Sequence, residues 1–158
     1  MIVRRAETDA EINEVRRLFR EYAESLGVDL CFQGFEEELA GLPGTYGPPG
    51  GSLLIAEEDR TIVGCVALRK LGGSICEMKR LYVKPQFRGR GLGKALVERI
   101  IEEGTELGYT KMRLDTLDRL KEAMAVYEAF GFRRIEPYYV NPLPDVVYWE
   151  LDLHPQRR

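Results

Sequence analysis

EMKRLYVKPQFRGRGLGK, residues 77–94, is the stretch that decides the fold. Its first part, Glu77 to Val83, contains aromatic and β-branched residues that favour a strand. Pro85 ends that strand, because proline has no N–H to donate to a sheet. Three glycines then lie between Arg88 and Lys94, directly before an amphipathic run. Glycines there let the backbone approach a ligand, and the unpaired N–H groups of a helix start attract an anion. The stretch therefore predicts a strand, a loop, a helix start and a phosphate or pyrophosphate ligand.

Two widespread phosphate-binding motifs do not match this loop. A P-loop reads G-x-x-x-x-G-K-[ST]. Gly93 and Lys94 fit it, but Arg88 replaces its first glycine and Ala95 replaces the hydroxyl residue that binds magnesium. The dinucleotide fingerprint G-x-G-x-x-G fails as well, because Lys94 occupies its third glycine position.

Strand and helix patterns alternate on both sides of the loop. Strands joined by short links favour antiparallel pairing, whereas a strand–helix–strand unit needs a right-handed crossover to a parallel neighbour. We therefore predict a mixed sheet of the α/β class, antiparallel in its first half, with a parallel step after the glycine loop. The expected strands are 2–6, 52–57, 61–69, 74–83, 111–116, 133–140 and 146–153, and the expected helices are 8–26, 35–39, 92–107 and 123–130.

The segment GLPGTYGPPGG, residues 41–51, is too rich in glycine and proline for regular structure. It is either a surface connector or a mobile edge of a substrate site, with Tyr46 as the side chain that contacts the substrate.

Three segments together resemble the Gcn5-related N-acetyltransferase (GNAT) superfamily. Residues 88–93 match its [QR]-x-x-G-x-[GA] signature, and residues 81–83 resemble the fourth strand that runs into it. Residues 123–132, AMAVYEAFGF, resemble its A-x-x-x-Y-E-x-x-G-F segment. The resemblance covers residues 53–132 well, although Leu120 stands where many members carry asparagine. It implies the GNAT fold, a central mixed sheet with helices on both faces and splayed fourth and fifth strands.

The resemblance implies an acetyl-CoA-dependent N-acetyltransferase. Acetyl-CoA would be the acyl-donor cosubstrate, and a primary amine of a small molecule, an amino acid or a peptide N-terminus would attack it directly in a ternary complex. The loop would bind the pyrophosphate and the strand would bind the pantetheine arm by its backbone. The expected cofactor-binding residues are Leu81, Tyr82, Val83, Arg88, Gly89, Arg90, Gly91, Leu92, Gly93 and Lys94.

Two residues are expected to be catalytic by this resemblance. Tyr127 occupies the position of the general acid that protonates the leaving thiolate, although it is also compatible with a half-buried packing residue. Glu77 lies six residues before Val83, the offset of the base in the histone-acetyltransferase branch. Alternatively, Glu77 pairs with Arg69 or Lys79 and a water chain removes the proton. Odd-numbered residues from 77 to 83 share one face of the strand unless a bulge intervenes. On that shared face, Glu77 would point towards the thioester.

The residues expected around the acceptor are mostly aromatic and few are basic, which suits a small amine, an amino acid or a peptide N-terminus better than a polyanion. They are Tyr22, Tyr46, Glu77, Tyr138, Tyr139, Asn141 and Trp149.

Composition limits the remaining function classes. The chain has 158 residues, 44% of them hydrophobic and 31% charged, as expected of a single globular domain over residues 1–158. It has no apolar run of the about 18–20 residues that span a bilayer and no signal-peptide pattern. A net charge of −3 argues against a nucleic-acid partner. The single histidine, His154, argues against a zinc site, so we expect no metal.

Three cysteines, Cys31, Cys65 and Cys76, form no C-x-x-C pair. This suggests reduced thiols and a cytoplasmic location. A cysteine relay is a competing mechanism, but without a histidine beside them buried structural cysteines are the better interpretation.

Two alternatives stay open. A non-catalytic acyl-CoA-binding or sensing module would keep the glycine loop without needing a general acid. The last predicted strand would also present an exposed edge through which two chains could pair as a homodimer.

Overall fold

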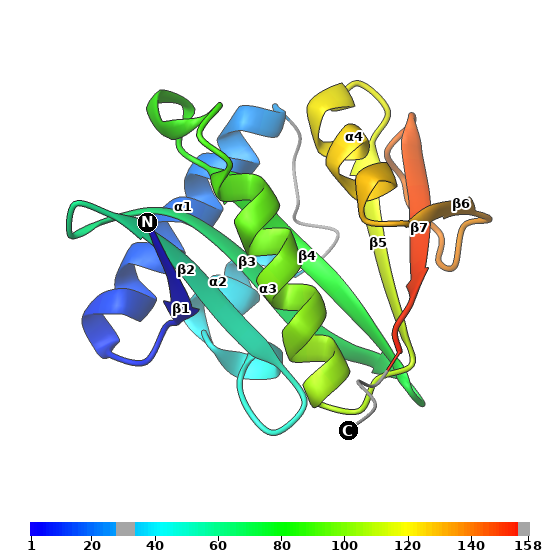
Figure 1. The fold of residues 1–158 in the computed structure, drawn as a ribbon, viewed down its shortest axis with the longest axis horizontal. Helices are drawn as coiled ribbons and strands as arrows, with labels where there is room; N and C mark the ends of the chain where they lie inside the picture. Colours follow the sequence, from blue (N-terminus) through cyan, green and yellow to red (C-terminus); the bar gives the residue numbers. More distant parts are fainter. Residues whose placement is uncertain (28–33, 155–158) are drawn as a thin grey trace.

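The structure is a computed structural model that describes residues 1–27 and 34–154; Cys31 therefore lies outside the described residues. Its centre is a seven-stranded sheet in the order β1-β2-β3-β4-β5-β7-β6 (Figure 1). The strands are β1 (Ile2–Arg5), β2 (Ser52–Glu58), β3 (Thr61–Gly72), β4 (Ile75–Val83), β5 (Lys111–Leu117), β6 (Arg133–Ile135) and β7 (Val146–Asp152).

Helices cover both faces of this sheet. On one face lie α1 (Asp9–Leu26), α2 (Phe35–Ala40) and the short 3-10 helix η2 (Gly44–Tyr46), which share a core with inward-facing residues of β2 and β3. On the other face lie α3 (Leu92–Glu106) and α4 (Lys121–Ala129), which share a second core with β2 to β5 and β7 (Figure 1). No described helix is long and apolar enough to cross a membrane.

The pairing pattern confirms the predicted mixed sheet. Strands β1 to β4 pair antiparallel in sequence order, and β5 pairs antiparallel with β7. Strand β4 pairs with β5 in parallel, but only where residues 75–77 meet residues 111–113. Beyond these pairs the two strands diverge, which is the splay expected of the GNAT fold.

A β-bulge in β4 reverses the faces of its residues. Arg80 has φ of +61°, and the register with β3 shifts beside it. Leu81 and Val83 pack into the core below α3, whereas Glu77 and Lys79 lie on the α2 side of the sheet. The expectation that these odd-numbered residues share one face is therefore wrong, because the bulge intervenes.

Two further expectations differ from the structure at the end of the chain. Strand β6 stops at Ile135 instead of residue 140, because Pro137 cannot donate to a ladder. Strand β7 lies between β5 and β6, so the last strand is not the exposed edge on which a homodimer was predicted. The homodimer itself stays a prediction without that argument.

The glycine- and proline-rich segment 41–51 contributes to the core. Tyr46 is only 1% exposed, packs edge-on against Phe19 and donates a hydrogen bond from its hydroxyl to Glu38 Oε1 at 3.0 Å. The expectation that Tyr46 contacts a substrate is wrong, because this side chain is fully used inside the protein.

Candidate active site

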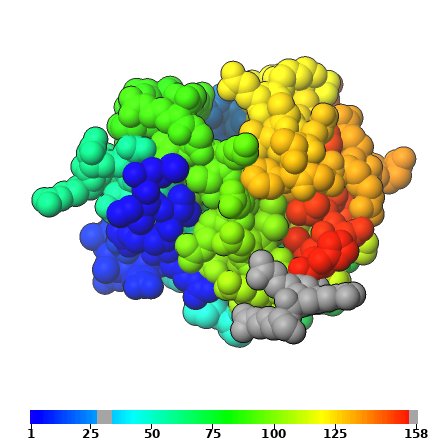
Figure 2. Space-filling model, viewed as in Figure 1, coloured from blue at the N-terminus to red at the C-terminus, as the bar shows by residue number. Residues whose placement is uncertain are grey.

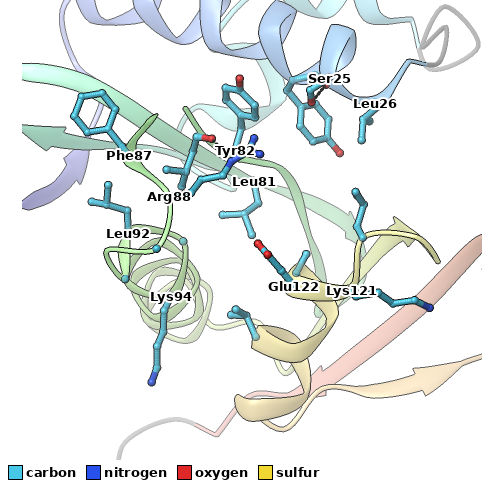
Figure 3. A pocket seen from close by; sticks show the side chains of 18 of the residues that line it. Ser25, Leu26, Leu81, Tyr82, Phe87, Arg88, Leu92, Lys94, Lys121 and Glu122 are labelled. Carbon is cyan, nitrogen blue, oxygen red and sulfur yellow. Dashed lines mark hydrogen bonds between the residues drawn. The ribbon is translucent and has the colours of Figure 1, made fainter. Parts of the chain in front are cut away.

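A cleft of about 610 Å³, here called the splay cleft, opens where β4 and β5 diverge. In Figure 2 it appears as a notch between the green loop before α3 and the yellow start of α4. Figure 3 shows Leu81 of β4 between α3, which carries Lys94, and α4, which carries Glu122. The cleft is lined by Tyr22, Ser25, Leu26, residues 81–83, residues 87–89, residues 91–94, residues 119–123 and Val126.

The glycine loop gives one wall of the splay cleft an anion-binding geometry. Gly89 and Gly91 have φ of +78° and +82°, a region that side-chain-bearing residues rarely adopt. Gly91 is the N-cap of α3 and supplies no side-chain cap, so the first N–H groups of the helix keep no side-chain partner. Such an uncapped start of a 15-residue helix attracts phosphate oxygens. The loop therefore fits a pyrophosphate.

Basic side chains surround this wall. Arg88 comes from the loop and Lys94 from the first turn of α3, whereas Arg119 precedes α4 and Lys121 begins it. Among the lining residues that the structure describes, Glu122 is the acidic one. The two basic residues near α4 were missed in the sequence, because their approach to the loop depends on the splay and not on local spacing. Four cations around one cleft suit a ligand with several phosphate charges.

The two loop arginines differ in position. Arg88 lines the splay cleft, donates from Nε to the Val83 carbonyl oxygen at 2.9 Å and lies over the Tyr82 ring. The Arg90 guanidinium lies over the Phe87 ring, and Arg90 does not line the cleft. All the other expected cofactor-binding residues, Leu81, Tyr82, Val83, Gly89, Gly91, Leu92, Gly93 and Lys94, do line it.

Tyr127 lies at the inner end of this site. It is 5% exposed, and its ring packs against Phe132 and Trp149. It also lines a small cavity of about 50 Å³ that shares Leu81 and Ala123 with the splay cleft. Burial raises the pKa of Tyr127 above its ordinary value, so the hydroxyl keeps its proton.

A second hollow of about 490 Å³, here called the far pocket, lies on the α2 side of the sheet. Lys79 and Arg80 line both the far pocket and the small cavity beside Tyr127. The splay cleft, the small cavity and the far pocket are therefore consecutive along the bulge of β4. The lining residues of the far pocket are Glu38, Arg69, Leu71, Glu77, Lys79, Arg80, Arg113, Tyr138, Tyr139 and Val140.

Comparison with known proteins decides the family. The profile described as the acetyltransferase (GNAT) family matches residues 12–132. The chain belongs to the GNAT acetyltransferase family.

Curated GNAT relatives extend over almost the whole chain. An uncharacterized N-acetyltransferase of Schizosaccharomyces pombe is 47% identical, over 90% of this chain and 89% of that protein. An uncharacterized N-acetyltransferase of Dictyostelium discoideum is 34% identical, over 97% of this chain and all of that protein.

Solved GNAT structures share the fold at low sequence identity. A GNAT-family acetyltransferase of Staphylococcus aureus Mu50 has a TM-score of 0.80 at 21% identity, covering 97% of this chain and 99% of that one. The yncA protein of Salmonella typhimurium, solved with its cofactor acetyl-CoA, has a TM-score of 0.75 at 18% identity, covering 99% of this chain and 96% of that one.

Glu77 lies outside the splay cleft of this GNAT protein and lines the far pocket. It is 1% exposed, and both of its carboxylate oxygens have partners. Oε1 accepts from Arg69 Nε at 2.8 Å, and Oε2 accepts from the Tyr138 hydroxyl at 2.6 Å. Lys79 Nζ lies 3.9 Å from Oε1. Both partners named in the alternative reading of Glu77 are thus in contact with it, and a substrate amine reaches this carboxylate only by way of another group.

The residues expected around the acceptor separate into several places. Tyr138 and Tyr139 line the far pocket with Glu77, whereas Tyr22 lines the splay cleft. Asn141 donates its amide to the Tyr139 hydroxyl at 2.8 Å. Trp149 is 2% exposed in the core below α4 and is therefore not a lining residue, contrary to expectation.

The far pocket is also more basic than predicted, because Arg69, Lys79, Arg80 and Arg113 line it. Sequence reasoning named Arg69 and Lys79 only as partners of Glu77 and missed Arg80 and Arg113, because only the strand register and the bulge bring these cations to one pocket.

The two described cysteines are buried thiols. Cys65 and Cys76 are fully buried, and burial raises the pKa of Cys76 to about 12. A thiol with so high a pKa holds its proton and is a poor nucleophile, which supports the structural reading of both residues. Among residues 1–27 and 34–154, no three His, Cys, Asp or Glu side chains gather in a way that could hold a metal ion.

Proposed function

We propose that this protein transfers the acetyl group of acetyl-CoA to a primary amine, by direct attack in a ternary complex. One observation carries the proposal. The cavity beside Tyr127 shares Leu81 with the splay cleft and Lys79 with the far pocket, so these two hollows lie on either side of it at the bulge of β4. A donor and an acceptor held in these two hollows would therefore approach each other without a covalent enzyme intermediate. The Salmonella relative in fold, solved with acetyl-CoA, supports the choice of donor.

The donor side of the proposal rests on the loop and on the open edge of β4. The N–H groups at the start of α3, with Arg88 and Lys94, would bind the phosphates of coenzyme A. Residues 78–83 of β4 have no partner in β5, so the backbone groups on that edge are available to the amides of the pantetheine arm. Leu81 and Val83 line the cleft at this edge.

The proposed chemistry needs one proton removed and one supplied. The amine nitrogen attacks the thioester carbonyl carbon, the C–N bond forms, and the C–S bond then breaks. A backbone N–H at the bulge near Leu81 or Tyr82 would stabilise the oxyanion. The Tyr127 hydroxyl would give its proton to the departing thiolate. The raised pKa of Tyr127 favours this step, because the hydroxyl stays protonated until the thiolate leaves.

Glu77 is the proposed base for the amine proton. Because Arg69 and Tyr138 already occupy its two oxygens, the proton would travel through a water molecule or the Tyr138 hydroxyl. A water chain without Glu77 is the alternative path.

The setting of the reaction is proposed as the cytoplasm, which the buried reduced thiols Cys65 and Cys76 support. A single domain is proposed because all seven strands form one sheet.

The test is thiol release from acetyl-CoA in the presence of panels of amines, amino acids and peptides. Acceptor-dependent release, with an acetylated product seen by mass spectrometry, would support the transferase. Tight binding of coenzyme A without release across the panels would contradict it and favour the acyl-CoA-binding module.

A further inference from the structure

A row of alternating charges crosses the sheet beside the far pocket. In the strand register Arg69 of β3 faces Glu77 of β4, Glu77 faces Arg113 of β5, and Arg113 faces Glu150 of β7. Arg133 of β6 faces Glu150 from the other side. Residues directly opposite in a sheet share a face, so these five side chains form one continuous row, here called the charge row.

The far pocket covers one end of the charge row. Among the residues that the structure describes, its lining has four basic side chains, of which Lys79 and Arg80 have further partners, and two carboxylates. Both carboxylates are already bound from within the pocket, since Glu77 accepts from Arg69 and Glu38 accepts from Arg80 at 2.9 Å. Neither of these carboxylates binds Arg113, whose partner Glu150 lies outside the pocket lining, so an anion entering the pocket would meet a guanidinium that no carboxylate of the described lining holds.

Arg113 has the geometry to bind such an anion. Its Nε donates to Glu150 Oε2 at 2.8 Å, and its guanidinium lies 5.3 Å from the centre of the Tyr138 ring. Among residues 1–27 and 34–154 no acceptor is hydrogen-bonded to its two terminal nitrogens. Glu150 neutralises Arg113 only in part, because it also binds Lys111 and Arg133. A planar guanidinium fixed at Nε and on one face offers its remaining edge to a carboxylate.

The position of Arg113 relative to the bulge gives the ligand a direction. Glu77, its neighbour in the row, precedes Lys79 by two residues and lies on the same face of β4. Lys79 marks the point where the far pocket meets the cavity beside Tyr127. A small ligand with an anion at Arg113 would thus extend its other polar end towards the bulge. The volume of about 490 Å³ suits a small molecule.

We propose that the acceptor is an amine that also carries a carboxylate, of the amino-acid class, and that Arg113 binds that carboxylate in the far pocket. This inference rests on the proposed acetyl transfer. It adds a substrate class and a specificity-determining residue to the same site.

Matched acceptors test it directly. Leucine and phenylalanine would be compared with their carboxamides and with isoamylamine and phenethylamine, which lack the carboxylate. For the better of the two amino acids, we expect a kcat/KM about 10–100-fold higher than for its carboxamide and for the matching amine without a carboxylate. This is the range that a charge-assisted hydrogen-bond pair contributes.

Arg113→Gln should remove this preference by raising the KM for the amino acid by a similar factor, with the affinity for coenzyme A unchanged. Arg113→Lys should restore part of it, because the charge returns without the planar fork. Arg133→Gln is the matched control, since it removes an arginine from the same Glu150 but lies outside the far pocket. An equal loss of preference in Arg133→Gln would overturn the assignment to Arg113.

Binding of the products separates the two proposals. Calorimetry in the presence of coenzyme A would compare N-acetyl-leucine and N-acetyl-phenylalanine with their carboxamides. Carboxylate-selective binding that Arg113→Gln abolishes, without turnover of any acceptor, would overturn the transfer reaction alone. Turnover or binding that is equal for acids and amides would overturn the inference alone.

Discussion

Glu77 and Arg69 face each other across β4 and β3, and Arg69 Nε lies 2.8 Å from Glu77 Oε1. The Tyr138 hydroxyl occupies the other carboxylate oxygen of Glu77. Removing either partner of a buried ion pair leaves the other charge unpaired. Glu77 therefore contributes to the stability of the fold whatever its part in the reaction.

Replacing Glu77 by glutamine should therefore lower the free energy of unfolding by about 1–3 kcal/mol. If Glu77 is also the base, turnover of Glu77→Gln falls at neutral pH and recovers partly at high pH, where the amine is already deprotonated. Melting temperature and the pH–rate profile of the same variant measure both effects.

Glu150→Gln is the matched control for Glu77, because Glu150 is a buried glutamate of the same charge row outside the far pocket. It should lose stability without a change in the shape of the pH–rate profile. A normal profile in Glu77→Gln would contradict the base assignment and leave the water chain.

Tyr127→Phe should reduce turnover by about 10²–10⁴-fold, the usual contribution of a general acid. The ring contacts with Phe132 and Trp149 remain, so stability and coenzyme A affinity should change little. Tyr109→Phe is the control, since Tyr109 is another buried tyrosine whose hydroxyl bonds to the Gly50 carbonyl and lies outside the splay cleft. Turnover of Tyr127→Phe within a factor of about two of the wild type would exclude the acid role.

The pH dependence of turnover should also show the raised pKa of Tyr127, whose first cause is burial. A general acid works in its protonated form, and a raised pKa keeps that form dominant as the pH rises through the ordinary tyrosine value of about 10. We therefore expect no loss of kcat from this group up to that pH. A fall in kcat below pH 10 that is absent from Tyr127→Phe would contradict a raised pKa for Tyr127.

Gly93→Asp should weaken coenzyme A binding without unfolding the protein. Among the described residues, a Cβ at Gly93 would meet the Val83 side chain, at 4.0 Å. A carboxylate in the first turn of α3 also interacts favourably with the helix dipole. The same carboxylate would repel the pyrophosphate, and we expect at least about a tenfold loss of affinity by calorimetry. Gly93→Asn has the same size without the charge and should lose much less. Gly91 is less suitable for this test, because its φ of +82° strains any replacement.

Arg80→Met should destabilise the fold by about 3–5 kcal/mol, because it leaves Glu38 without the cation that binds it. Arg80 is 4% exposed and its Nε lies 2.9 Å from Glu38 Oε2. Urea unfolding would measure the loss. Arg80→Met combined with Glu38→Met should recover part of it, and a double variant less stable than the single one would contradict the pairing argument.

The glycine loop was predictable because its meaning is local. The spacing from Arg88 to Lys94 and the following apolar period determine a strand, a turn and a helix start within one stretch of chain. The faces of β4 were not predictable, because one residue in the bulge at Arg80 exchanges them. The charge row was equally hidden, since Arg69, Glu77 and Arg113 meet only through the registers of three strands. Tyr46 and Trp149 were misplaced because aromatic residues suit a core and a pocket alike.

The short contact between β4 and β5 has a consequence for amide hydrogen exchange. Because only residues 75–77 pair with residues 111–113, the alternate N–H groups of residues 78–83 that point away from β3 face the gap between β4 and β5, which holds the cavity beside Tyr127 and the splay cleft, and not a strand. In deuterated water these amides should exchange faster than their neighbours bonded to β3. A ligand lying along that edge would slow them selectively. Exchange rates along this one strand would thus report whether the cleft is occupied, in a protein that has been given no acceptor.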